Sequence, residues 1–158
     1  MPMKYIRLTQ EQFHTLADEF AVFLAAQSID AMTWDRLKNT DTAEVDRQLD
    51  AFSDLVWEDV LSKAKFLEHR THDVCFIFQV NDDSMSMLRF SWLDHTVDWT
   101  TVALAEWLKT HWSNEMLEID KGTKQLTENR NQEIFKLIQQ GASIADAPEY
   151  ASLFLMFS

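Results

Sequence analysis

Four carboxylates recur at every fourth residue of a segment whose apolar residues have helical spacing. They are Asp46, Asp50, Asp54 and Glu58. Residues 41–59 hold seven acidic side chains and one basic one, so this segment carries −6 of the chain's net charge of −12. Like charges four apart on a helix repel by roughly 0.2–0.5 kcal/mol per pair. The spacing therefore predicts an acidic stripe on one helix, suited to neutralisation by a basic protein partner.

Two other interpretations of the acidic stripe stay open. At a rise of about 1.5 Å per residue, successive carboxylates lie about 6 Å apart along the axis, which loosely imitates a row of phosphates. Alternatively, the stripe is a solvated helix face that neighbouring basic residues neutralise in part. Those residues are Arg36, Lys38, Arg47 and Lys63. Docking of a basic protein on the stripe gives the leading hypothesis, a non-catalytic cytosolic interaction or adaptor domain.

A second group of residues has the chemistry of a zinc site. His69, His72 and Cys75 follow an H-x2-H-x2-C spacing around an expected turn. Imidazole nitrogen and thiolate sulfur suit zinc, and three such ligands would leave a position for water. Against this, Cys75 lies in an apolar run, and residues 72 and 75 point to opposite faces if one strand holds both. A buried structural cysteine beside two turn histidines is the competing interpretation, and no cofactor is predicted.

Motifs for phosphate or nucleophile chemistry are missing from the sequence. Glycine occurs only at positions 122 and 141, so there is no P-loop, no G-x-G-x-x-G and no G-x-S-x-G elbow. A non-catalytic function is therefore favoured. The alternative is a small enzyme or ligand-binding domain with a pocket between sheet and helices. Its candidate lining residues are Trp92, Trp107, His69, His72 and Cys75.

The bulk composition predicts one soluble domain over residues 1–158. The chain is 46% apolar and has only two glycines and two prolines, which suits helices better than a barrel with many tight turns. One cysteine rules out an internal disulfide and fits a reducing compartment. The longest apolar runs, 74–78 and 153–157, are far shorter than the roughly 20 residues of a membrane span. We therefore expect a cytoplasmic protein that contacts no membrane and, being acidic, binds no nucleic acid directly.

Three segments of the first 63 residues have apolar residues at helical spacing. A capping-box pattern at Thr9 precedes the first segment, and Asp30 and Asp41 fit as N-caps of the other two. The expected long helices cover residues 10–27 and 42–63, with a short helix between them. This pattern predicts an N-terminal helical hairpin or three-helix unit.

The middle of the chain changes to strand-like alternation. Apolar residues alternate over residues 74–80, a turn cluster covers 81–84, and alternation resumes through 88–92. This predicts an antiparallel hairpin at about residues 74–92, beside a further strand at 65–70. The expected elements that follow are a helix from Asp98 or Thr100 through Trp112, a short strand at 116–119 ended near Gly122, a helix capped by Thr127 and closed by Gly141, and a last helix opened by Asp146. Helices, a small antiparallel sheet and C-terminal helices together predict an α+β domain.

The last helix, which runs to Phe157, is apolar nearly all round over residues 153–157. Such a helix must be covered, either by its own domain or by a second subunit. A homodimer through the C-terminal helix is therefore an alternative to a monomer.

Three stretches of the sequence resemble a family of short uncharacterised bacterial proteins. They are Leu8–Lys38 (LTQEQFHTLADEFAVFLAAQSIDAMTWDRLK), Phe52–His69 (FSDLVWEDVLSKAKFLEH) and Asn129–Ala142 (NRNQEIFKLIQQGA). The resemblance spans nearly the whole chain and is looser over residues 72–125. It implies a compact cytosolic bacterial domain. Because the family is a domain of unknown function, the resemblance assigns no catalytic or binding residue.

Overall fold

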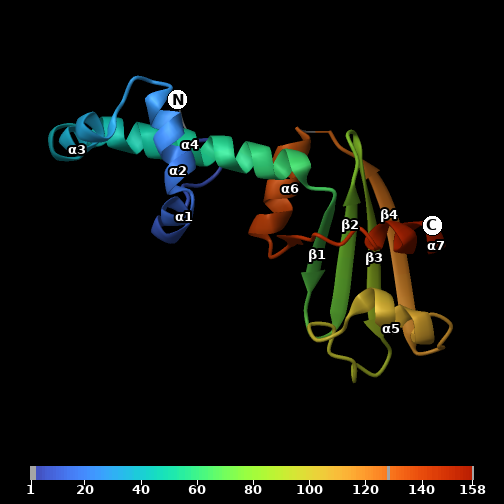
Figure 1. Cartoon of the computed structure of the whole chain (residues 1–158). Coiled ribbons are helices and arrows are strands. Elements are labelled where there is room, and N and C mark those ends of the chain that lie inside the picture. Colours follow the sequence, from blue (N-terminus) through green and yellow to red (C-terminus); the bar gives the residue numbers. More distant parts are fainter. Residues whose placement is uncertain (1–2, 128, 158) are drawn as a thin grey trace. The chain divides into compact units, whose positions relative to one another are not determined.

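The computed structural model describes residues 3–127 and 129–157, in which seven helices and five strands occur (Figure 1). The helices are α1 (Gln10–Thr15), α2 (Ala17–Ala25), α3 (Ala31–Thr40), α4 (Thr42–Lys63), α5 (Leu104–His111), α6 (Arg130–Gln139) and α7 (Tyr150–Met156). The strands are β1 (Phe66–Arg70), β2 (Val74–Val80), β3 (Ser84–Trp92), β4 (Leu117–Gln125) and β5 (Ser143–Ile144). The predicted α+β class is confirmed.

The chain divides into two compact units, Met1–Ser62 and Lys63–Ser158, which we call the N-terminal unit and the sheet unit. Each unit has buried apolar residues of its own. The single domain expected over residues 1–158 stays a prediction. Within the described residues, no helix combines the length and the apolar character needed to cross a bilayer.

The N-terminal unit contains α1 to α4. Its first helix begins with the predicted capping box: Gln12 N–H donates to Thr9 Oγ1 (3.1 Å), and Thr9 N–H donates to Gln12 Oε1 (2.8 Å). The prediction of a single helix over 10–27 is wrong, because the backbone leaves helical geometry at Leu16 and the segment forms two helices, α1 and α2. Asp30 caps α3 by accepting from Thr33 N–H (2.7 Å), as the sequence predicted.

An aromatic cluster holds the N-terminal unit together. The ring of Phe20 lies 5.0 to 5.4 Å from the rings of three neighbours. These are Phe13, Trp34 and Phe52. Phe52 comes from α4, which forms one continuous helix over the predicted residues. Burial of Phe52 fixes the orientation of α4, and the acidic stripe therefore runs along a defined side of it.

The sheet unit is built on an antiparallel sheet with strand order β4-β3-β2-β1-β5. The β2–β3 hairpin confirms the prediction for residues 74–92, and Asn81 N–H closes its turn on Ser84 O (2.9 Å). One face of the sheet packs against α5 and α7 (Figure 1). The buried residues of this core include Cys75, Ile77, Leu88, Phe90, Trp99, Leu104, Leu108, Leu153 and Phe154.

Four boundaries in the sheet unit differ from the sequence prediction. The last helix, α7, begins at Tyr150 and is not opened by Asp146. Helix α5 begins at Leu104, because the Asp98 carboxylate binds Thr100 N–H (3.0 Å) and the Thr100 hydroxyl (2.6 Å) and so forms a turn instead of a cap. Strand β4 passes through Gly122 and ends at Gln125. Asn129, not Thr127, caps α6 by accepting from the N–H of residues 131 and 132.

The predicted helix stop at Gly141 is confirmed, and it leads into β5, a short strand that the sequence did not predict. Gly141 has a φ of 114°, a conformation that side chains of L-residues rarely adopt. An added Cβ there would also lie 2.9 Å from His69 Nε2. Glycine at this position therefore allows the chain to turn from α6 back to the sheet, where β5 pairs with β1.

Candidate functional site

The carboxylates of the acidic stripe have partners within the N-terminal unit, in the segment before α1. Arg7 contacts two of them: its Nε donates to Asp50 Oδ1 (2.6 Å), and its Nη1 lies 3.4 Å from Asp46 Oδ1. Asp54 accepts from the backbone N–H groups of Lys4 (2.7 Å) and Tyr5 (2.9 Å). The first two carboxylates are thus held by a side chain and the third by the backbone.

Glu58 completes this arrangement. It accepts from Lys4 Nζ (3.1 Å) and from the Tyr5 hydroxyl (2.5 Å). Burial of the Tyr5 ring and its hydrogen bond to Glu58 raise the pKa of Tyr5. Three residues after Tyr5, Leu8 N–H donates to Ser53 Oγ (3.0 Å), which extends the contact beyond the stripe. A basic partner could reach these carboxylates fully only by displacing residues 4–8.

The three candidate zinc ligands do not come together. Cys75 is fully buried in the core, and its burial raises the pKa of the thiol to about 11. His69 is paired with Phe76 across β1 and β2, so its side chain lies on the opposite face of the sheet from Cys75. His72 is exposed in the turn between those strands. Among the residues that the structure describes, no three His, Cys, Asp or Glu side chains form a group able to hold a metal ion.

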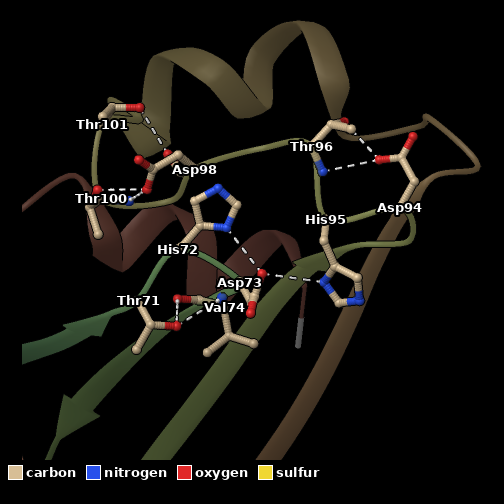
Figure 2. Close-up of polar contacts among 10 residues, drawn as sticks. All are labelled: Thr71, His72, Asp73, Val74, Asp94, His95, Thr96, Asp98, Thr100 and Thr101. Atoms are coloured by element: carbon tan, nitrogen blue, oxygen red, sulfur yellow. Dashed lines mark hydrogen bonds and ion pairs between the residues drawn. The ribbon is translucent and has the colours of Figure 1, made fainter.

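His72 instead belongs to a small polar cluster at one end of the sheet (Figure 2). Asp73 Oδ1 lies 3.0 Å from His72 Nδ1 and 3.5 Å from His95 Nδ1, so one carboxylate is shared between two imidazoles. Asp98 adds a further negative charge near His72. The hydrogen bond to Asp73 and the charges of Asp73 and Asp98 raise the pKa of His72 above its ordinary value of 6.5.

The contacts in this cluster lead us to expect a change in the pKa of the His72 imidazole when Asp73 is replaced. In the Asp73→Asn variant, the pKa of His72 should fall toward 6.5, because the neighbouring charge is lost. Since folding raises this pKa, the cluster stabilises the folded chain fully below pH 6.5, and this stabilisation is lost as pH rises through the folded-state pKa. An NMR titration of the His72 ring protons measures the pKa of His72, with Asp120→Asn as the control. An unchanged His72 pKa in Asp73→Asn would contradict this account.

The sheet unit also contains a groove between α5 and α7, with a volume of about 740 Å³. Its apolar walls are formed by both helices, and its mouth carries charged side chains. The wall residues include Leu104, Leu108, Trp112, Leu153 and Met156. Two of them, Trp112 and Met156, are 58% and 60% exposed, which is unusual for side chains of this size. The groove therefore offers apolar surface that water covers in the absence of a ligand.

Arg70 and Tyr150 form the polar end of this groove. Arg70 donates from Nε to Glu68 (3.1 Å), from Nη2 to the Tyr150 hydroxyl (2.8 Å), and from Nη1 to the carbonyl oxygens of Trp99 (3.2 Å) and Val102. The Tyr150 hydroxyl in turn donates to Glu68 (2.6 Å). Burial, reinforced by this bond to Glu68, raises the pKa of Tyr150 to about 12. Tyr150 therefore keeps its proton at neutral pH and donates it to the hydrogen bond with Glu68.

A second groove, of about 730 Å³, lies on the other side of α7. Its lining includes polar side chains of the sheet and apolar residues near the end of the chain. They include Gln79, Ser86, Lys121, Thr123, Phe154 and Phe157. Helix α7 itself buries Leu153 and Phe154 against the sheet and leaves Leu155 80% exposed. The apolar run 153–157 is thus covered only in part by its own unit, since Leu155 and Met156 stay exposed, and the homodimer through the helix stays a prediction.

The family of this chain follows from comparison with known proteins. The model of a family described as "Family of unknown function (DUF6495)" matches residues 3–158. The chain belongs to this family. No curated protein and no solved structure matches it. Membership in DUF6495 confirms the resemblance to an uncharacterised family noted in the sequence, and it assigns no activity to any residue.

Sequence reasoning missed the residues at the polar end of the groove. Arg70, Glu68 and Tyr150 are separated by up to 82 residues, and none forms a recognisable motif with another. One signal was available: Glu68 and Arg70 alternate on a strand whose same-face residue Phe66 is apolar, so two charges had to be buried together. The pocket residues proposed from the sequence, such as Trp92 and His72, do not line this groove.

Proposed function

We propose that this protein is a non-catalytic binding protein of the bacterial cytoplasm, and that the groove between α5 and α7 is its ligand site. The observation that supports this most directly is a groove of about 740 Å³ with apolar walls and one buried polar end. Ligand sites commonly have volumes of roughly 300–1,000 Å³ and this combination of lining groups. The buried single cysteine agrees with a reducing compartment.

The charges around the groove favour an uncharged ligand. Glu68 compensates Arg70, and Lys109 pairs with Glu106 at the mouth (2.9 Å), which leaves Glu149 as the remaining charge of the lining. An anion would meet no net positive charge here, and the chain as a whole is strongly acidic. The ligand class that fits is a neutral, largely apolar molecule that presents a hydrogen-bond acceptor to Arg70.

The test uses 1-naphthol, a neutral aromatic probe, and NMR spectra of the backbone amides. Binding should shift the amides of residues 104–112 and 150–156 more than those of other residues. Ser152→Trp fills the groove from α7 and should abolish these shifts, because Ser152 is exposed and lines the groove. The matched control is Thr110→Trp, which adds the same bulk at an exposed position of α5 outside the lining.

Two outcomes would contradict the proposal. One is binding that survives Ser152→Trp with unchanged affinity. The other is a set of shifts confined to the second groove, around Ser86 and Thr123, which would move the ligand site to the other side of α7.

A second candidate function is the adaptor role predicted from the acidic stripe. It is favoured by the fact that the stripe already holds a basic segment, residues 4–7, through both side chains and backbone. A basic protein partner carrying a similar segment would compete for the same carboxylates. Such a complex would be sensitive to salt, because screening weakens the attraction between a basic partner and this acidic chain.

A further inference from the structure

Strand β4 is an edge of the sheet: it pairs with β3 on one side, and within the described residues no strand pairs with it on the other. The direction of its backbone groups follows from two hydrogen bonds at its ends. Leu93 N–H donates to Met116 O (2.9 Å), and Leu126 N–H donates to Asp83 O (2.8 Å). Because an antiparallel ladder alternates, the even-numbered residues of β4 bond to β3 and the odd-numbered ones direct N–H and C=O outward.

The outward groups therefore belong to Leu117, Ile119, Lys121, Thr123 and Gln125. The N–H of Leu117 is already used, because it donates to Asn114 O (3.1 Å). The groups from Ile119 to Gln125 form a continuous row along an exposed strand. Such a row is a template for another strand.

From this edge we infer that two copies of the chain pair through β4, antiparallel, about a two-fold axis that passes through Gly122. Pairing of this kind would join two five-stranded sheets into one continuous sheet. Gly122 on the axis would face Gly122 of the second copy as a non-hydrogen-bonded pair, the position where two backbones approach most closely. Lys121 and Thr123 of opposite copies would then exchange hydrogen bonds, as would Ile119 and Gln125.

Charge selects this register. With Gly122 on the axis, Asp120 of each copy lies opposite Lys124 of the other, on the same face of the sheet. With the axis at residue 121, Lys121 of one copy would face Lys121 of the other. With the axis at residue 120, Asp120 of one copy would face Asp120 of the other. An axis at residue 119 places Glu118 opposite Asp120. Only the register centred on Gly122 pairs opposite charges without pairing like ones.

The local charge of β4 also suits self-association. The strand has two acids, Glu118 and Asp120, and two bases, Lys121 and Lys124, so its net charge is zero in a chain of net charge −12. Edge strands are commonly protected by charged side chains. Here those charges oppose pairing with strands of unrelated charge order and complement a second copy. Because the remaining charges of the two copies repel each other, moderate salt should strengthen the dimer by screening this long-range repulsion.

The experiment measures the molar mass of the full chain by sedimentation equilibrium up to millimolar concentration. The wild type should dimerise, and Asp120→Lys and Lys124→Asp should each raise the dissociation constant roughly tenfold, since each converts two opposite-charge pairs to like-charge pairs. An equimolar mixture of the two variants should dimerise again, because lysine at 120 then faces aspartate at 124. The swapped double variant D120K/K124D should also recover the dimer, but less completely than the mixture, because it places a lysine beside Arg89 and an aspartate beside Glu133, the residues that Asp120 and Lys124 contact within one copy.

A backbone variant checks the same edge without changing charge complementarity. Lys121→Pro removes an outward N–H while leaving the ladder to β3 intact, since residue 121 does not donate to β3. It should abolish the dimer, whereas Lys121→Ala, which keeps the N–H, should not. Circular dichroism confirms that each variant is folded.

Three results would overturn the inference. The first is a wild-type chain that stays monomeric at millimolar concentration. The second is a dimer that persists in folded Lys121→Pro. The third is a mixture of the two charge variants that associates no more strongly than either variant alone, which would place any self-association elsewhere, such as at α7.

Discussion

Replacing Arg70 with methionine is expected to lower the free energy of unfolding of the sheet unit by about 3 kcal/mol. The substitution removes one side chain that links β1, the loop at 99–102 and α7. It would leave Glu68 as a charge without its cation, and the carbonyl oxygens of Trp99 and Val102 without their donor. Only 19% of the Arg70 side chain is exposed, so water would replace these bonds poorly.

The comparison variants separate charge from geometry. Arg70→Lys keeps the charge but lacks the planar fork that reaches several acceptors, so it should recover part of the loss. Tyr150→Phe removes one hydroxyl from the same network and should cost about 1–2 kcal/mol. Urea unfolding followed by tryptophan emission measures all three, because Trp99 is buried in this unit. If Arg70→Met unfolds at the same urea concentration as the parent chain, the network does not stabilise the sheet unit.

The second large effect is expected at Asp54, where replacement by alanine should destabilise the N-terminal unit by about 2 kcal/mol. Its carboxylate accepts two backbone N–H groups, from Lys4 and Tyr5, and so anchors the segment before α1 on α4. Hydrogen exchange of the amides of residues 4–8 measures the effect directly, and protection there should decrease most.

The matched control is Asp46→Ala in the same stripe. Asp46 is 60% exposed and lies 3.4 Å from a guanidinium that Asp50 also binds at 2.6 Å. Exposed pairs of this kind contribute about 0–1 kcal/mol, so its loss should barely change exchange at residues 4–8. Equal effects of Asp46→Ala and Asp54→Ala would show that total charge matters here, and not the backbone contacts of Asp54.

The local spacing of apolar residues was sufficient to predict most of the helices and strands. The spacing of Val45, Leu49 and Phe52 predicted α4, and alternation predicted the β2–β3 hairpin, because both signals depend only on which face is buried. The ends of helices were less predictable where a side chain could either cap the helix or close a turn before it. Asp98 fits a helix cap by its residue type, yet its carboxylate closes a turn on Thr100 and the helix begins six residues later.

The candidate sites were less predictable, because they depend on contacts between distant segments. The stripe's carboxylates were identified correctly as one side of one helix, but their partners lie 39 to 54 residues earlier in the sequence. Lys4 and Arg7 were the available signal, as two bases ahead of the first helix in an acidic chain. The groove likewise joins α5 and α7, which no local periodicity places side by side.

The burial of Cys75 has a practical chemical consequence. A thiol enclosed in the core, with a pKa of about 11, is almost wholly protonated at neutral pH and out of reach of maleimides and iodoacetamide. A second cysteine placed on the surface would therefore react alone. Fluorophores and spin labels can be attached at chosen positions while the native residue remains in place.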